Sequence, residues 1–275
     1  MIADRINHYL ASHDTTVNEC VLAEVGALAQ HIFKRQFMTE PDTTAGTLRL
    51  SACGKCPRQL AYHYHNFPQN GKTIDPRARM VFLYGDLIEM MVLELAKLAG
   101  CDIESSGLSQ AGVGLSVDDH FILGHPDGTY QGRLVEIKSL TTYAYRDFEQ
   151  GIISDIYRAQ INAYLEASLL EQCILIGVNK DSGVLGELLI DREPGIVAGV
   201  RHNLAQVMRS RPDLLPPAPE RLDPNENGIY PWECRYCAFH GTCRANAGLV
   251  LRGSRYVLKE KEGLWPTLST HVSPH

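Results

Sequence analysis

The stretch GHPDGTYQGRLVEIKS, residues 124–139, decides how the fold of this chain is interpreted. It places two acids and a lysine in segments that otherwise have the residue pattern of two consecutive strands. Side chains alternate between the faces of a strand, so Glu136 and Lys138 point the same way and Ile137 points into the opposite layer. If the two strands pair antiparallel through the turn at YQGR, Asp127 comes to lie beside Glu136.

Two neighbouring carboxylates repel each other unless a cation lies between them, and oxygen-rich sites suit Mg²⁺ or Mn²⁺. A lysine ammonium beside them can position a water and ease its deprotonation, while the cation neutralises charge that builds on a phosphate oxygen. This constellation hydrolyses phosphodiesters. The plainer alternative is that Glu136 and Lys138 form an exposed pair on an amphipathic strand and Asp127 is a turn residue.

Composition limits the class of protein. The chain has 275 residues, 44% of them hydrophobic, which is enough to bury a sizeable core. It has no apolar run of membrane-spanning length, and its first residues lack a cationic start followed by an apolar segment. We therefore expect no membrane partner and a cytoplasmic location in a bacterial, archaeal or phage-infected host cell. The net charge of −6 argues against a simple electrostatic binder of nucleic acid, although metal-binding acids would contribute to it.

Hydrophobic periodicity divides the chain into three parts. The part over 1–100 is predicted to be helical, with helices over 17–38, after Ser51 and over 76–100. The part over 101–212 alternates between the two periods. Its expected strands are 101–109, 112–117, 120–130, 133–140, 172–180 and 184–190, and its expected helices are 145–150, 154–170 and 193–210. The part over 213–275 contains a proline-rich connector, a cysteine-dense segment and a mildly basic tail.

The acidic pair and its surroundings resemble the PD-(D/E)XK nucleases, specifically their RecB-like branch. The matching motifs are GHPDG, VEIKS, the upstream GDLIE that ends at Glu89 and the downstream QINAY over 160–164. By this resemblance the Mg²⁺ or Mn²⁺ ligands are Glu89, Asp127, Glu136 and the Ile137 carbonyl. The implied catalytic and substrate-positioning residues are Asp127, Glu136, Lys138, Gln160 and Tyr164. Glu89 replaces the histidine that is commoner in the family, which leaves the preferred metal open, since an oxygen donor also fits a hard cation.

Singly, Glu89 and Tyr164 have ordinary explanations. Glu89 fits a solvated residue on an otherwise apolar helix, and Tyr164 fits an aromatic side chain packed in the core.

Three of the eight cysteines, Cys234, Cys237 and Cys243, are spaced C-x2-C-x5-C, which leaves a tetrahedral site one ligand short. In a reducing compartment clustered cysteines are better read as metal ligands than as disulfides. Spacing alone permits zinc, and it permits either Cys53 or Cys56 as the fourth ligand.

A distant N-terminal cysteine joined to a C-terminal triplet resembles the iron–sulfur members of the RecB-like branch, which include the AddB nuclease domain and the CRISPR-associated adaptation nuclease. The resemblance implies a 4Fe-4S cluster held by Cys56, Cys234, Cys237 and Cys243. Such a cluster would tie the N-terminal helical part to the C-terminal segment. The remaining cysteines in apolar segments are predicted to be buried small hydrophobic residues: Cys20, Cys101 and Cys173.

The resemblance implies an α/β fold in one nuclease domain over 1–275, with a restriction-endonuclease-like core whose central mixed sheet is flanked by helices. The implied activity is that of a metal-dependent DNA exonuclease acting on single-stranded ends in recombination, repair or phage genome processing. Alternatives are a CRISPR-adaptation-type nuclease that trims spacer precursors, a sequence-specific endonuclease, and a non-catalytic iron–sulfur protein that binds nucleic acid.

DNA phosphates require cations along the binding surface. The candidates are Arg58, Arg244, Arg252 and Arg255, for which a solvated basic face is an equally good explanation. The sequence has no G-x-x-x-x-G-K-[ST] motif, so unwinding would need a helicase partner. An annealing protein or an integrase are the other partners that such a module implies.

Overall fold

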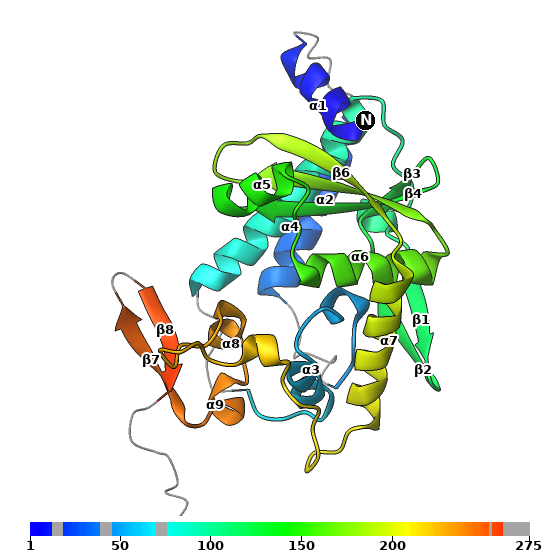
Figure 1. The fold of residues 1–275 in the computed structure, drawn as a ribbon. Helices are drawn as coiled ribbons and strands as arrows, with labels where there is room; N and C mark the ends of the chain where they lie inside the picture. Colours follow the sequence, from blue (N-terminus) through cyan, green and yellow to red (C-terminus); the bar gives the residue numbers. More distant parts are fainter. Residues whose placement is uncertain (13–18, 39–45, 70–75, 253–254, 261–275) are drawn as a thin grey trace, which may run out of the picture.

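The centre of the molecule is a four-stranded sheet with the strand order β3-β4-β5-β6 (Figure 1). The computed structural model describes residues 1–12, 19–38, 46–69, 76–252 and 255–260, apart from the side chains of 76–78 and 255. Its strands are β3 (Gly128–Tyr130), β4 (Arg133–Leu140), β5 (Gln172–Asn179) and β6 (Leu185–Asp191). The β3–β4 and β5–β6 pairs are antiparallel and the β4–β5 pair is parallel. The expected mixed sheet flanked by helices is therefore present.

Two helices connect the parallel strands, because a parallel pair requires a crossover that passes over one face of the sheet. They are α5 (Thr142–Glu149) and α6 (Asp155–Ser168). The hydroxyl of Thr141 accepts a hydrogen bond from the Ala144 amide, and the hydroxyl of Ser154 accepts one from the Tyr157 amide. These caps satisfy amide groups that the first turn of a helix leaves without partners.

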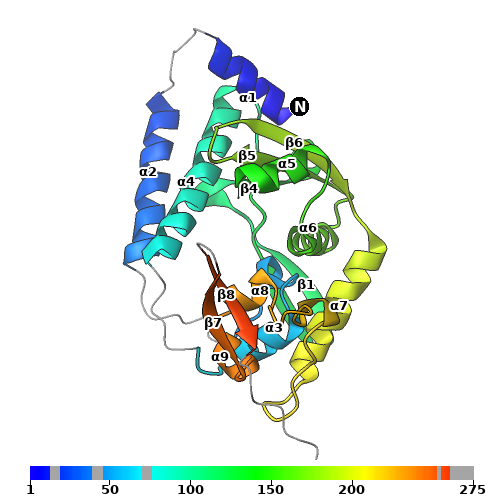
Figure 2. The same cartoon turned by 60° about the vertical axis from the view of Figure 1, so that its left-hand side comes forward.

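The alternation of side chains along β4 and β5 builds one hydrophobic cluster on each face of the sheet. On one face Leu134 and Cys173 pack against α5 and α6. On the other face Val135 and Ile176 pack against α1 (Ile2–Ala11) and α4 (Pro76–Leu98). A further helix, α2 (Glu19–Phe37), lies along the outer side of α4 (Figure 2).

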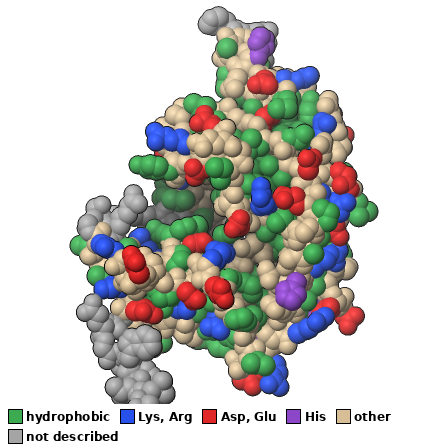
Figure 3. Space-filling model, in the orientation of Figure 1, with side chains coloured by type: hydrophobic (Ala, Val, Ile, Leu, Met, Phe, Trp, Pro, Cys, Tyr) green, Lys and Arg blue, Asp and Glu red, His purple; other side chains and the backbone are tan. Residues whose placement is uncertain are grey.

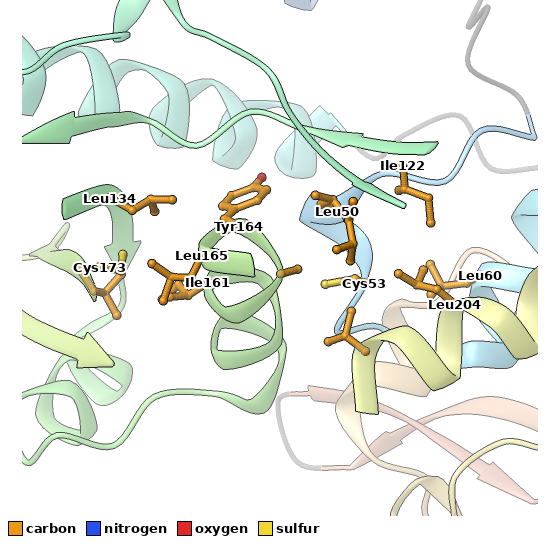
Figure 4. Close-up of a cluster of buried hydrophobic side chains, with 14 of the residues drawn as sticks. Leu50, Cys53, Leu60, Ile122, Leu134, Ile161, Tyr164, Leu165, Cys173 and Leu204 are labelled. Carbon is orange, nitrogen blue, oxygen red and sulfur yellow. The ribbon is translucent and has the colours of Figure 1, made fainter. Parts of the chain in front are cut away.

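The cluster on the α6 face continues past α6 into the lower part of the molecule. Figure 4 shows Tyr164 between Leu134 of the sheet and Leu50, with Leu60 and Leu204 beyond them. This part consists of α3 (Pro57–Tyr64), α7 (Pro194–Arg209), and the hairpin of β1 (Val113–Val117) and β2 (His120–Gly124). Short 3-10 helices lie at Leu50–Ala52, Gly107–Ser109 and Glu220–Leu222. One core therefore joins the sheet to the lower part.

The C-terminal segment forms two short helices and a hairpin below α4 (Figure 1). Its elements are α8 (Trp232–Tyr236), α9 (His240–Cys243), β7 (Ala247–Arg252) and β8 (Arg255–Glu260). A small cluster of Leu222, Cys234 and Leu258 joins the hairpin to the connector and to α8. The sequence analysis predicted only a mildly basic tail here, so this hairpin was not anticipated.

Two predicted strands differ from the structure, and α1 was not predicted. Residues 101–109 make only an isolated bridge between Glu104 and Thr129, because Ser105 and Gly107 adopt positive φ angles that interrupt an extended chain. The strand expected over 120–130 is divided at Pro126, which has no N–H for a ladder hydrogen bond. β2 therefore pairs with β1, and β3 joins the central sheet.

Among the described residues no helix is both long and apolar enough to span a bilayer.

Glu166 of α6 links this helix to the chain after β6 and to α7. Its carboxylate accepts hydrogen bonds from Arg201 at 2.8 Å and from Arg192 at 3.0 Å. The hydrogen bond from Arg201 outweighs partial burial and lowers the pKa of Glu166. A carboxyl whose pKa is lower in the folded state stabilises that state at neutral pH, and the contribution is lost as the pH falls through the folded-state pKa.

Glu166→Gln should therefore lower the free energy of unfolding at pH 7 by about 1 kcal/mol, since the site is partly screened by solvent. The difference from the wild type should be smaller at about pH 3, because it is lost as the pH falls from the unfolded-state pKa of about 4.3 through the lower folded-state pKa of Glu166. Urea unfolding at the two pH values measures this, with Glu226→Gln on an exposed carboxylate as the control. An equal loss at both pH values would show that the ion pairs are not its cause.

Candidate active site

The hairpin of β3 and β4 brings Asp127 next to Glu136. Gly128 pairs with Val135, and the two-residue turn of Gln131 and Gly132 has positive φ angles of 51° and 73°. Such a turn fits the twist of the two strands and fixes their register. Asp127 precedes the first paired residue, and its Oδ2 accepts a hydrogen bond of 2.7 Å from the backbone N–H of Ile137.

Glu136 is the most buried acid of the site, with 1% of its surface exposed. Its Oε1 accepts hydrogen bonds from Lys138 Nζ at 2.5 Å and from Gln160 Nε2 at 2.9 Å. Its Oε2 is also buried but has no hydrogen-bond partner in the described part of the chain. A buried carboxylate oxygen without a partner carries a large desolvation cost. Oε2 of this carboxylate is therefore available to a ligand.

Three carboxyl groups share this region, and each has a raised pKa. Burial is the first cause for both Asp127 and Glu136, and the charges of Glu136 and Glu89 raise the pKa of Asp127 further. On α4, burial followed by the charges of Glu136 and Asp86 raises the pKa of Glu89 to about 7. The acids thus oppose one another's ionisation, as expected for a group of acids without a cation.

Lys138 remains an ammonium in this setting. Burial opposes its charge, but the charges of Glu136 and Asp127 outweigh burial and raise its pKa. Its Nζ also lies 5.1 Å from the centre of the Tyr157 ring. A lysine held in the charged form can donate hydrogen bonds and stabilise negative charge, but it is not poised to take up a proton.

Gln160 and Tyr164 lie one turn apart on α6, as their spacing predicts. Besides its bond to Glu136, Gln160 Nε2 donates to the hydroxyl of Tyr164 at 3.2 Å. Tyr164 is 1% exposed, and Figure 4 shows its ring among hydrophobic side chains with the hydroxyl pointing out of the cluster. The tyrosine therefore supports Gln160, and Gln160 orients the Glu136 carboxylate.

Two hollows flank the acids. The first, named here the α4–α8 groove, has a volume of about 660 Å³ and is lined by Glu89, Ile137 and Lys138 together with residues of α4, α5, α6 and α8. The second, the β2 groove, has a volume of about 590 Å³ and is lined by Glu89, Asp127 and Tyr164 with residues of β2. Glu89 lines both, so the acids lie where two solvent-accessible grooves approach each other.

Several groove residues were not anticipated from the sequence. Arg35 and Arg49 line the β2 groove, and Trp232 and Lys180 line the α4–α8 groove. Arg35 lies 2.7 Å from a carboxylate oxygen of Asp86. No sequence motif marks these residues, because they come from separate elements that only the tertiary fold brings to the site.

The site offers oxygen donors rather than a ready-made metal cage. Within the described ranges no three His, Cys, Asp or Glu side chains converge on a position that could hold a metal ion. The unpartnered Oε2 of Glu136 and the mutual repulsion of the three acids nevertheless fit a hard cation, which prefers oxygen ligands. Glu89, Asp127, Glu136 and the Ile137 carbonyl are the residues that could hold it.

One cysteine at the N-terminus of α3 and three from the C-terminal segment line one cavity. They are Cys56, Cys234, Cys237 and Cys243. Burial raises the pKa of the Cys56 and Cys234 thiols, and it raises that of Cys237 to about 11. The Arg244 guanidinium lowers the pKa of Cys234 in part, and its charge would favour thiolates there. The triplet and Cys56 thus line the same cavity, and their role as ligands of one cluster stays a prediction.

The other cysteines lie elsewhere. Cys53 is buried in the main core, where desolvation raises the pKa of its thiol to about 12, and it does not line the cysteine cavity. Cys101 and Cys173 are buried, as predicted. Cys20 is exposed on α2, so the prediction that it is a buried hydrophobic residue was wrong.

Of the arginines proposed for DNA contacts, Arg58, Arg244 and Arg252 are not among the residues that line the two grooves. Arg58 donates to the Pro216 carbonyl at 2.8 Å, and Arg244 donates to the Leu222 carbonyl at 3.0 Å. Arg252 is exposed on β7, and the side chain of Arg255 lies outside the described residues. Their contact with phosphates stays a prediction.

Comparison with known proteins gives no family. No family model matches the chain, and no curated protein matches it. Among solved structures, SSO0001 has a TM-score of 0.49 at 17% identity, covering 80% of this chain and 96% of its own. LHK-Exo in complex with dAMP has a TM-score of 0.45 at 13% identity, covering 65% and 90%. A second structure of this alkaline exonuclease, from Laribacter hongkongensis, has a TM-score of 0.39 at 13% identity. All three TM-scores are below 0.5, and these likenesses assign no activity to this chain.

Millimolar Mg²⁺ or Mn²⁺ should raise the melting temperature, because a cation that binds only the native state stabilises it. The gain is about 2.7 kcal/mol when the cation is at 100 times its Kd. Glu136→Gln, which removes a charge without changing shape, should lose most of this shift. Thermal unfolding with and without the cation tests this, with Glu149→Gln on the exposed end of α5 as the matched control. A shift of equal size in both variants would place the cation elsewhere.

Proposed function

We propose that the chain is a nuclease of the PD-(D/E)XK type that uses Mg²⁺ or Mn²⁺ to hydrolyse DNA phosphodiesters from single-stranded ends. The observation that carries this proposal is the grouping of Asp127, Glu136 and Lys138 on β3 and β4, with one oxygen of Glu136 buried and unpartnered. A purely structural ion pair would not need a second buried acid beside it.

Each residue of the candidate active site has a distinct part in this proposed reaction. Asp127 and Glu136 would hold the cation together with Glu89, and Gln160 fixes the Glu136 carboxylate from α6. Lys138, held as an ammonium, donates to the attacking water and stabilises negative charge on the phosphate. When bound, the cation would neutralise charge that develops on the phosphate oxygens.

We further propose that Cys56, Cys234, Cys237 and Cys243 hold a 4Fe-4S cluster. The four thiols line one cavity, and iron–sulfur clusters are held by cysteine thiolates. Zinc, which four cysteines also bind, is the alternative. The role of the cluster is structural: it would fasten α3 to α8 and α9.

The proposed activity requires a source of single-stranded ends. A nuclease module without a phosphate-binding motif for ATP needs duplex unwinding by a helicase partner, or substrates that already have single-stranded ends. Recombination, repair, phage genome processing and spacer trimming all involve such ends, and an annealing protein or an integrase is a candidate partner that acts on the trimmed DNA.

The activity is tested with end-labelled linear single-stranded DNA, linear duplex and circular single-stranded DNA in Mg²⁺ or Mn²⁺. The wild type should shorten the linear single strand and leave circles intact, and the label position gives the polarity. Glu136→Ala should reduce the rate by at least roughly 10²- to 10³-fold, the scale lost with one preorganised electrostatic group.

Two outcomes would redirect the proposal. Nicking of circles would favour an endonuclease. DNA binding without cleavage in any divalent metal would favour the non-catalytic binding protein.

Cys237→Ser should remove one of four thiolates and therefore lower the iron content, the brown colour and the melting temperature, the last by roughly 5 °C or more. Iron and sulfide analysis of anaerobically purified protein measures this, with Cys20→Ser on α2 as the control that should keep its iron. A Cys237→Ser protein with full iron content and unchanged melting temperature would remove Cys237 from the ligand set, and bound zinc in place of iron would exclude the cluster.

A further inference from the structure

The α4–α8 groove carries aromatic side chains that the chemistry of the acids does not use. Phe82 of α4 and Trp232 of α8 line it, with Tyr157 of α6 nearer the acids. Phe82 is 54% exposed and Trp232 is 62% exposed, although large aromatic side chains gain free energy when they are buried. Figure 3 shows a hollow with hydrophobic side chains inside it, between the part of the surface that carries α5 and the part that carries the C-terminal elements.

The same groove leads directly to the candidate catalytic residues. Lys138 lines its inner end beside Tyr157, and the exposed Lys180, which follows β5, lines it as well. Ser139 and Thr141 add hydroxyl groups. Besides the acids Asp86 and Glu89, the lining thus combines ammonium groups and hydroxyls, which suit phosphates, with flat apolar rings, which suit nucleobases.

This combination distinguishes a single strand from a duplex. In a duplex each base is covered by its neighbours, so only its edge is available to a side chain. In a single strand the base faces are free, and stacking on an aromatic side chain contributes about 1–3 kcal/mol per base whatever the sequence. Separated aromatic rings along a groove with cationic residues therefore match a single strand.

We propose that the α4–α8 groove binds single-stranded DNA, with bases stacked on Trp232 and Phe82 and a backbone phosphate on Lys180. The groove would then select single strands and guide them to Lys138. This inference rests on the proposed nuclease function, because the strand it describes is the substrate of that site.

The chain provides its own reporter for this contact. It has two tryptophans, Trp232 and Trp265, and the latter lies outside the described residues. Trp265→Phe leaves Trp232 as the sole tryptophan, and Glu136→Gln added to it blocks cleavage. A labelled oligothymidylate is titrated against this protein with its metal content intact, while tryptophan fluorescence and oligonucleotide anisotropy are recorded together.

The inference predicts that tryptophan quenching saturates together with the anisotropy for the single strand, and that a blunt hairpin duplex of equal length quenches far less. Trp232→Ala should weaken single-strand binding by roughly 5- to 150-fold, and Trp232→Phe should restore most of the affinity. Tyr143→Ala, which removes an exposed aromatic ring of α5 outside the groove lining, is the matched control and should bind normally. Iron content and melting temperature of Trp232→Ala, measured alongside, separate lost stacking from damage to the neighbouring cysteine cavity.

Lys180→Ala gives an independent test, because each neutralised phosphate of a single strand contributes about 0.7 to the slope of log affinity against log salt concentration. The variant should lower the magnitude of this slope by about that amount. Binding without quenching, together with unchanged affinity in Trp232→Ala, would overturn the inference. If this overturning result were accompanied by normal cleavage, the proposed nuclease function would stand and only the groove inference would fall. Quenching by the single strand together with no cleavage by the wild-type protein would instead support the groove and contradict the proposed nuclease function.

Discussion

The structure depends on one buried carboxylate, that of Glu136, in the middle of the central sheet. Taking a charge out of water is costly, and the surrounding groups offset this cost only in part. Lys138 and Gln160 both donate to Oε1, and nothing in the described chain donates to Oε2. This carboxylate, with one oxygen left without a hydrogen bond from the described residues, is held in place by three features. They are the β3–β4 register, the α5–α6 crossover and the packing of Tyr164 behind Gln160.

The packing that buries the acids also leaves two grooves open beside them. The hydrophobic clusters on both faces of the sheet fix β4, while α4 continues past the sheet and carries Glu89 to the position where two grooves approach each other. The acids raise one another's pKa in this setting. A site that is rigid behind and open in front can bind a cation and a charged polymer without large rearrangement.

Much of the fold follows from periodicity, because β4, β5 and α6 are long and regularly patterned. The failures have physical causes. Pro126 divides what the composition makes look like one strand. The short α1 shows a helical apolar pattern mainly at Ile2 and Ile6, which is too little to identify a helix from sequence. The motifs located the acids, and the structure adds that Tyr164 is buried with its hydroxyl beside Gln160. Trp232 and Lys180 could not be connected to the site, because only the tertiary fold places them beside β4.

The central claim is that the three acids hold a divalent cation. It is tested most directly by anomalous diffraction from crystals soaked in Mn²⁺, recorded at energies that separate manganese from iron. The account predicts a manganese peak among Glu89, Asp127 and Glu136, and an iron peak at the cysteine cavity. A well-ordered site without manganese at saturating concentration, or manganese bound only elsewhere, would contradict it.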